Sequence, residues 1–79
     1  MSPKSAKELF DFETFIKDVV DYMSRHHLYI QDMASLANCN GITMIRTLEL
    51  SSEPSLATII ILADIIDVSL DKYITINHL

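Results

Sequence analysis

Residues 31–73 most constrain the fold, because short apolar helical patterns alternate there with tight turn signals. The joints contain Asn, Gly, Ser, Asp and Pro, which are the residue types that cap helices and form turns. The 79 residues include one Gly and two Pro and are 49% hydrophobic, so helix breakers are few and a small core can form. The sequence therefore predicts a single compact all-α domain over residues 1–79, and it leaves the order of residues 1–10 open.

Five helices are predicted from apolar residues three or four positions apart and from capping residues at the helix starts. The first lies within residues 5–25, where Ser5 followed by Glu8 resembles a capping box and Asp11 is a competing start. The others span about residues 31–37, 42–49, 56–66 and 69–74. The tail at residues 74–77 alternates apolar and polar side chains, which predicts either a short strand or a frayed end.

The same spacing predicts which apolar side chains face the core. The expected inward residues are Leu9, Phe12, Ile16, Val19, Val20, Met23, Met33, Leu36, Ala37, Met44, Ile45, Leu48, Leu56, Ile59, Ala63 and Ile66. Ala34 is small enough to let another helix approach closely, which favours a tightly packed helix pair around the turn at residues 38–41.

The chain is acidic, with a net charge of −5, and the imbalance is strongest after residue 27. Residues 28–79 contain Arg46 and Lys72 as their only basic side chains, against six acidic ones. Because neutralisation of phosphates supplies most non-specific affinity for nucleic acid, we expect weak binding to DNA outside a specific site.

The sequence favours a cytoplasmic protein without a membrane partner. One cysteine, Cys39, excludes an internal disulfide and a Cys-based metal site within one chain, which fits a reducing compartment. No secretory signal is recognised at the N-terminus, and the longest apolar run, residues 59–63, is too short to span a bilayer.

No enzyme, cofactor or metal site is predicted. A single Gly rules out a Gly-rich phosphate loop, and no grouping of Ser, His and an acid is indicated. His26 and His27 are adjacent, so on a helix their side chains point about 100° apart and do not easily share one ion. We interpret this pair as a polar helix end, where partial positive charge is favourable.

Four segments in order resemble the lambda-repressor-like helix-turn-helix family of Cro and phage repressors. They are Gln31-Asp32-Met33-Ala34, Ile45-Arg46-Thr47-Leu48-Glu49, Glu53-Pro54-Ser55-Leu56 and Val68-Ser69-Leu70-Asp71-Lys72-Tyr73. The resemblance covers about residues 29–73 and implies a five-helix domain whose third helix lies in the DNA major groove.

The chain departs from the family pattern at its helix ends. Ile30 stands where the family has a capping Thr or Ser, and it cannot accept a hydrogen bond. Asn38 replaces the turn Gly, and the turn is one residue longer, which blurs the register of the third helix. Leu50 and Asp67 stand where the family has Gly after its third and fourth helices.

The resemblance implies a set of DNA contacts. The third helix would present Asn40, Gly41, Ile42, Thr43, Arg46 and Thr47 to base edges, and Gln31, Ser51 and Ser52 would bind phosphates. The alternative is that Asn40 only caps a helix and that Thr43 and Arg46 are only solvated.

A second candidate surface lies on the fourth helix. Ile61 and Ile65 are four positions apart and fall on a different face from the predicted core residues, which indicates a protein interface. Ile74 and Ile76 could extend it, or pair as a strand across a dimer. The alternative is a broader buried face beneath the first helix or the tail.

These features predict a small sequence-specific transcriptional regulator of phage or bacterial repressor type. Its expected partners are double-stranded DNA carrying an inverted repeat and a second copy of the chain. The alternative is an acidic protein-binding module on the same fold, such as an antirepressor or partner of another regulator, with little or no DNA binding.

Overall fold

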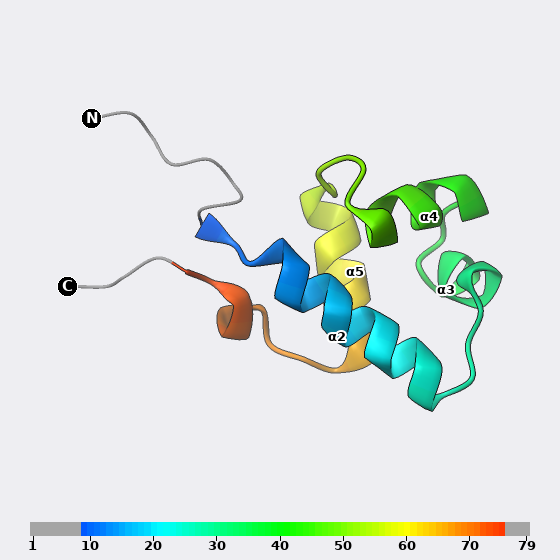
Figure 1. The fold of residues 1–79 in the computed structure, drawn as a ribbon, viewed down its shortest axis with the longest axis horizontal. Helices are drawn as coiled ribbons and strands as arrows, with labels where there is room; N and C mark the ends of the chain where they lie inside the picture. The colour runs from blue at the N-terminus through cyan, green and yellow to red at the C-terminus, as the bar shows by residue number, and fades with distance from the viewer. Residues whose placement is uncertain (1–8, 76–79) are drawn as a thin grey trace.

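The computed structural model describes residues 9–75, which form four α-helices and one 3-10 helix (Figure 1). They are α2 (Phe12–Arg25), α3 (Ile30–Leu36), α4 (Gly41–Glu49), α5 (Leu56–Ile66) and η1 (Leu70–Tyr73). The prediction of an all-α fold is confirmed, and the count of five α-helices is wrong. The last predicted helix is a single 3-10 turn, because the backbone is already extended at Ile74. No helix in this part of the chain is long and apolar enough to cross a bilayer.

The first helix begins at the later of its two predicted starts. The Asp11 carboxylate accepts hydrogen bonds from the N–H and the hydroxyl of Thr14, at 3.1 and 2.6 Å, and so caps α2. The competing start at Ser5 and Glu8 lies outside the described residues.

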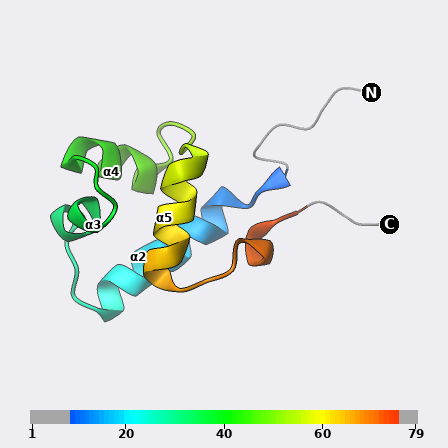
Figure 2. The same cartoon turned by 180° about the vertical axis from the view of Figure 1, so that it is seen from behind.

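The helices are arranged around α2, the longest of them (Figures 1 and 2). α5 crosses α2 and packs against it, η1 contacts α2 near its start, and α3 packs against α4 at the other end of the molecule. The described core residues are Phe15, Ile16, Val19, Met23, Met33, Ala34, Ala37, Met44, Ile59, Leu62, Ala63, Ile66 and Tyr73.

Four residues that were predicted to face inward are exposed, namely Val20, Leu36, Ile45 and Leu56. In α4 the buried side chains are Met44 and Thr47, one position before Ile45 and Leu48. Met44 was predicted to be core and is buried, whereas the predicted inward residue Ile45 is exposed, so the inward face of α4 is centred on Met44 and Thr47. This phase is set by the packing of α4 against α3, which the periodicity of nine residues does not fix.

Each α-helix ends in the same type of turn. The residue after or just beyond each helix adopts left-handed backbone, with φ values of 55°, 55°, 54° and 58° for His27, Asn38, Leu50 and Asp67. The next N–H then donates to the carbonyl five residues earlier: Leu28 to Met23, Cys39 to Ala34, Ser51 to Arg46 and Val68 to Ala63, at 2.8–3.1 Å. This pattern satisfies carbonyl groups that a helix end leaves without partners.

The C-terminal segment pairs with the residues that precede α2. The Asp11 N–H donates to the Tyr73 carbonyl at 2.8 Å, and the Thr75 N–H donates to the Leu9 carbonyl at 2.9 Å. The predicted tail strand is thus reduced, within the described residues, to one antiparallel bridge between Phe10 and Ile74. This pairing lies within one chain, and Ile76 lies outside the described residues.

Tyr73 connects η1 to α2 through its side chain as well. Its ring packs edge-on against Phe15 at 5.0 Å between ring centroids, and its hydroxyl donates to Asp18 Oδ2 at 2.6 Å. Lys72 Nζ lies 3.2 Å from the same oxygen. The Tyr73 hydrogen bond is the main reason that the pKa of Asp18 lies below its usual value of 3.8. Burial, followed by the bond to Asp18, raises the pKa of Tyr73 to about 12.

We expect Tyr73→Phe to lower the free energy of unfolding by about 1–2 kcal/mol at neutral pH, because it removes one hydrogen bond to a charged group. The lowered pKa of Asp18 stabilises the fold above about pH 4, and this contribution is lost as pH falls through the folded-state pKa. The raised pKa of Tyr73 stabilises the fold below pH 10, and this contribution is lost between pH 10 and about 12. The difference in urea unfolding between the two proteins should therefore be largest between these limits. An equal difference in strong acid would contradict this account.

Replacing Asp67 by Gly should raise the free energy of unfolding by about 0.5–1 kcal/mol, because Gly adopts left-handed backbone without a steric cost. Asp67 is exposed, and no side-chain hydrogen bond would be lost. The matched control is Asp64→Gly, at an exposed position inside α5, where Gly should destabilise the helix by a similar amount. Thermal unfolding would give opposite signs for the two variants.

Candidate nucleic-acid interface

α3 and α4 form a closely packed helix pair joined by residues 37–40. Ala34 and Ala37 are buried between the helices, and their small side chains allow the backbones to approach. Asn38 takes the left-handed backbone of the turn. The Asn40 Oδ1 atom then accepts the Thr43 N–H at 2.7 Å, which caps α4 and fixes its start at Gly41. The predicted capping role of Asn40 is therefore confirmed.

The start of α3 lacks a Ser or Thr cap and uses a different one. The Asp32 carboxylate reaches back and accepts the N–H of Tyr29 at 2.7 Å. This bond gives a partner to the Tyr29 N–H at the helix start, where Ile30 has no side-chain acceptor to offer. The helix therefore begins at Ile30, one residue before Gln31.

The outer face of α4 carries most of the predicted DNA-reading residues. Asn40, Thr43 and Arg46 are exposed, and Ile42 is 65% exposed although it is a large apolar residue. Ile42 and Arg46 are four positions apart and so lie on the same side of the helix. Apolar and hydrogen-bonding groups are thus brought together on one surface.

Gly41 has no structural reason within this chain to be glycine. Its φ is not positive, and a Cβ atom added there would meet nothing within 4 Å. The space next to the first turn of α4 is therefore open to an approaching molecule.

Thr47 does not belong to this surface. Its side chain is buried, and its hydroxyl donates to the Thr43 carbonyl at 2.8 Å. Such a bond to the preceding turn is a common way to satisfy a Thr hydroxyl within a helix. The predicted contact of Thr47 with DNA is therefore not available in this fold.

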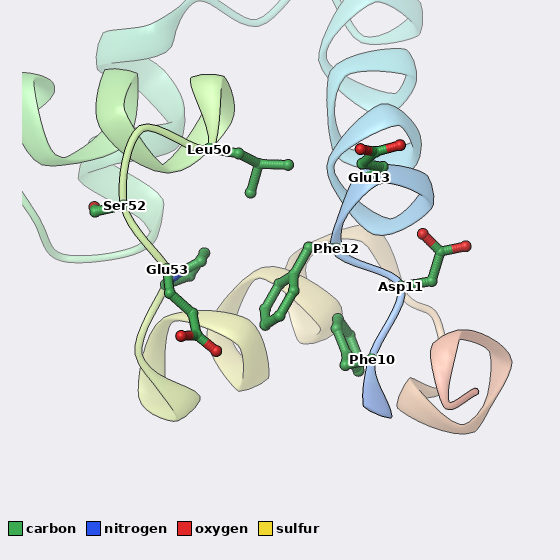
Figure 3. A pocket seen from close by; sticks show the side chains of 8 residues that line it. Phe10, Asp11, Phe12, Glu13, Leu50, Ser52 and Glu53 are labelled. Atoms are coloured by element: carbon green, nitrogen blue, oxygen red, sulfur yellow. The ribbon is translucent and has the colours of Figure 1, made fainter. Parts of the chain in front are cut away.

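The predicted phosphate contacts divide into two groups. Gln31 is exposed in the first turn of α3, where its amide is free to donate outward. Ser51 and Ser52 are exposed as well, but the Ser51 hydroxyl lies 3.4 Å from a Glu49 carboxylate oxygen. Ser52 lies beside Glu53 in the loop, and Glu13 at the start of α2 lines the opposite side of the same hollow (Figure 3). These carboxylates repel a phosphate, so the loop is a poor phosphate site.

Arg46 is the only basic residue between residues 30 and 55, where Asp32, Glu49 and Glu53 are acidic. The helix pair therefore lacks the basic patch that normally drives non-specific DNA binding. Recognition here would have to rely on neutral donors, one guanidinium group and apolar contacts.

The exposed apolar residues of α5 differ in part from those predicted to form a protein interface. Ile61 is 37% exposed, whereas Ile65 is half-buried against the core. Sequence reasoning missed Leu56 and Ile60, which are more exposed, at 72% and 50%. They were missed because α5 is apolar on nearly every side, so spacing alone did not identify its outer face.

Within residues 9–75, no three His, Cys, Asp or Glu side chains are grouped so that they could hold a metal ion. His26 ends α2 and stacks on Tyr22 at 4.1 Å between ring centroids, while His27 takes left-handed backbone. The two histidines therefore differ: His26 stacks through its ring, and His27 forms the left-handed turn through its backbone.

Asn40→Ala should lower the free energy of unfolding by about 1 kcal/mol, because the first turn of α4 loses its cap. Asn40→Ser should retain most of the stability, since Ser caps about as well as Asn. Urea denaturation of the three proteins would test this. Equal stabilities for the Ala and Ser variants would show that the 2.7 Å bond contributes nothing.

No protein-family model, curated protein or solved structure matches this chain. The functional interpretation of α4 therefore rests on the residues and geometry described above.

Proposed function

We propose that this protein is a sequence-specific DNA-binding transcriptional regulator that acts in the cytoplasm and reads DNA with α4. The observation that carries the proposal is the outer face of α4, where Ile42 is 65% exposed beside Asn40, Thr43 and Arg46. A large apolar side chain at the first turn of a helix is costly to leave in water. It is well suited to contact a thymine methyl group in the major groove.

Arg46, Asn40 and Gly41 each have a chemical role in this proposal. The Arg46 guanidinium can donate two parallel hydrogen bonds to a guanine. The Asn40 Oδ1 atom is engaged in the cap, so its amide NH2 group donates to a base or phosphate oxygen. The open space beside Gly41 lets the helix backbone approach the DNA closely.

Gln31 supports α4 from the neighbouring helix. It lies in the first turn of α3, and its amide donates to a phosphate without adding charge. Contacts of this kind fix the position of the protein on the duplex. They do not give the strong salt dependence of a basic patch.

A homodimer would present α4 twice to the two halves of an inverted repeat. The surface we assign to this pairing is the exposed face of α5 at Ile60 and Ile61, which are 50% and 37% exposed. Ile65 is excluded because it already packs against the core of its own chain. Two copies of α4 also double the number of Arg46 contacts.

The proposal is tested by selecting binding sites from random duplex DNA at low salt with the purified 79-residue chain. We expect a palindrome to be enriched. Arg46→Ala should weaken binding to it about tenfold or more and relax the preference at one base pair in each half. Arg25→Ala removes the same charge from the end of α2 and should change the affinity little. A folded chain that enriches no sequence at any salt concentration would overturn the proposal.

A further inference from the structure

A groove lies between the start of α2 and the loop at residues 50–54 (Figure 3). Its volume is about 450 Å³, and a second, more apolar hollow of about 320 Å³ continues from it towards Leu56 and Ile74. The two hollows share Phe10, Phe12, Glu53 and Pro54 in their walls, so they form one surface. We call this surface the phenylalanine groove.

The walls of the groove are held in place by the fold. The Phe10 and Phe12 rings pack edge-on at 5.0 Å between centroids, and Phe10 also packs against Phe15 at 5.6 Å. The backbone on either side of Phe10 is paired with the segment around Ile74. Figure 3 shows the Leu50 side chain extending from the loop towards the start of α2, and the Phe12 ring extending from the start of α2 on the side of Glu53. The groove is therefore preformed, which lowers the entropic cost of binding.

The apolar end of the groove remains exposed to water. Leu56 is 72% exposed and Ile74 is 42% exposed at its edge, while Ile59 forms buried floor beneath them. Isolated apolar residues on a surface are common, but here they border a hollow with further apolar walls. Such a continuous apolar surface is typical of a protein-binding site.

The other end of the groove is acidic. Glu13 and Glu53 line it and are exposed, and neither has a hydrogen bond or ion pair within residues 9–75. Asp11 adds a third carboxylate, whose bonds to Thr14 keep its pKa below the usual value. Among residues 9–75, no Lys or Arg lines either hollow. The charge at this end therefore has no partner from the groove walls.

We propose that the phenylalanine groove binds an apolar segment of a second protein that carries Lys or Arg beside its apolar residues. The apolar side chains would cover Leu56, Ile74 and the Phe10–Phe12 wall, and the basic ones would lie against Glu13 and Glu53. DNA is excluded as the occupant because phosphates would face these carboxylates. A second copy of the chain is disfavoured at this groove because symmetric pairing would bring Glu13 and Glu53 of both copies into one interface.

The test is a selection from a random peptide library with the full 79-residue chain as bait. We expect the enriched peptides to combine large apolar residues with Lys or Arg, and we would measure their affinity by fluorescence anisotropy. Leu56→Ser should weaken binding about tenfold, because an apolar contact is lost. The double variant Glu13→Gln with Glu53→Gln should weaken binding about fivefold at low salt and reduce its salt dependence.

Matched variants on α4 serve as controls. Ile42→Ser removes an apolar side chain of similar exposure, and Glu49→Gln removes a carboxylate outside the groove. Both should leave the peptide affinity unchanged, and so should Arg46→Ala, which tests the DNA proposal separately. All altered positions are exposed, so unchanged helicity by circular dichroism should accompany every result.

Several outcomes would overturn the proposal. One is enrichment of no peptide, or of peptides without basic residues. Another is an affinity that neither Leu56→Ser nor the double variant changes. Self-association that Leu56→Ser abolishes would identify a second copy as the occupant. Binding that tightens about tenfold in a variant lacking residues 1–8, which include Lys4 and Lys7, would identify the chain's own N-terminal segment instead.

Discussion

Tyr73 joins the C-terminal end of the described residues to α2, and the phenylalanine groove depends on this contact. Its carbonyl accepts the Asp11 N–H, its hydroxyl donates to Asp18, and its ring packs against Phe10 and Phe15. Because Asp11 also caps α2, the contacts of Tyr73 fix the end of η1 relative to the start of α2. The nearby ion pair of Lys72 with Asp18 is exposed on the lysine side and contributes little by comparison. α5 then packs across an α2 whose position is already set.

The existence of the helices and most of their buried residues were predictable from local chemistry, whereas the exact inward faces of α4 and α5 were not. Asn40 and Ser55 cap α4 and α5 through short contacts that depend only on neighbouring residues. The buried face of α5 is different, because an apolar residue on almost every side gives no periodic contrast. The exposure of Leu56 is decided by tertiary packing. The phenylalanine groove was not predictable either, because Phe12 and Leu50 are distant in sequence and line one hollow only in the folded chain.

The low positive charge of the α3–α4 pair and its exposed Ile42 fit one physical account. A surface with Arg46 as its only cation gains little from the phosphates of arbitrary DNA. Its discrimination would come from Ile42 and Arg46 at base edges, where a wrong base pair costs affinity directly. Glu49 and Glu53, beside Ser51 and Ser52, would lower the affinity for non-specific DNA further, because their carboxylates repel backbone phosphates. A small domain with little positive charge would therefore discriminate between DNA sequences while binding non-specific DNA only weakly.

Leu50 connects the two candidate surfaces. Its left-handed backbone ends α4 and lets the Ser51 N–H donate to the Arg46 carbonyl. A glycine would make the same turn without strain, whereas an ordinary L-residue is disfavoured there by about 1–2 kcal/mol. The Leu50 side chain offsets part of this cost, since it is half-buried against the core and lines the groove together with Phe12 (Figure 3). The strain at the end of the proposed reading helix is thus explained by the wall that the same residue supplies to the groove.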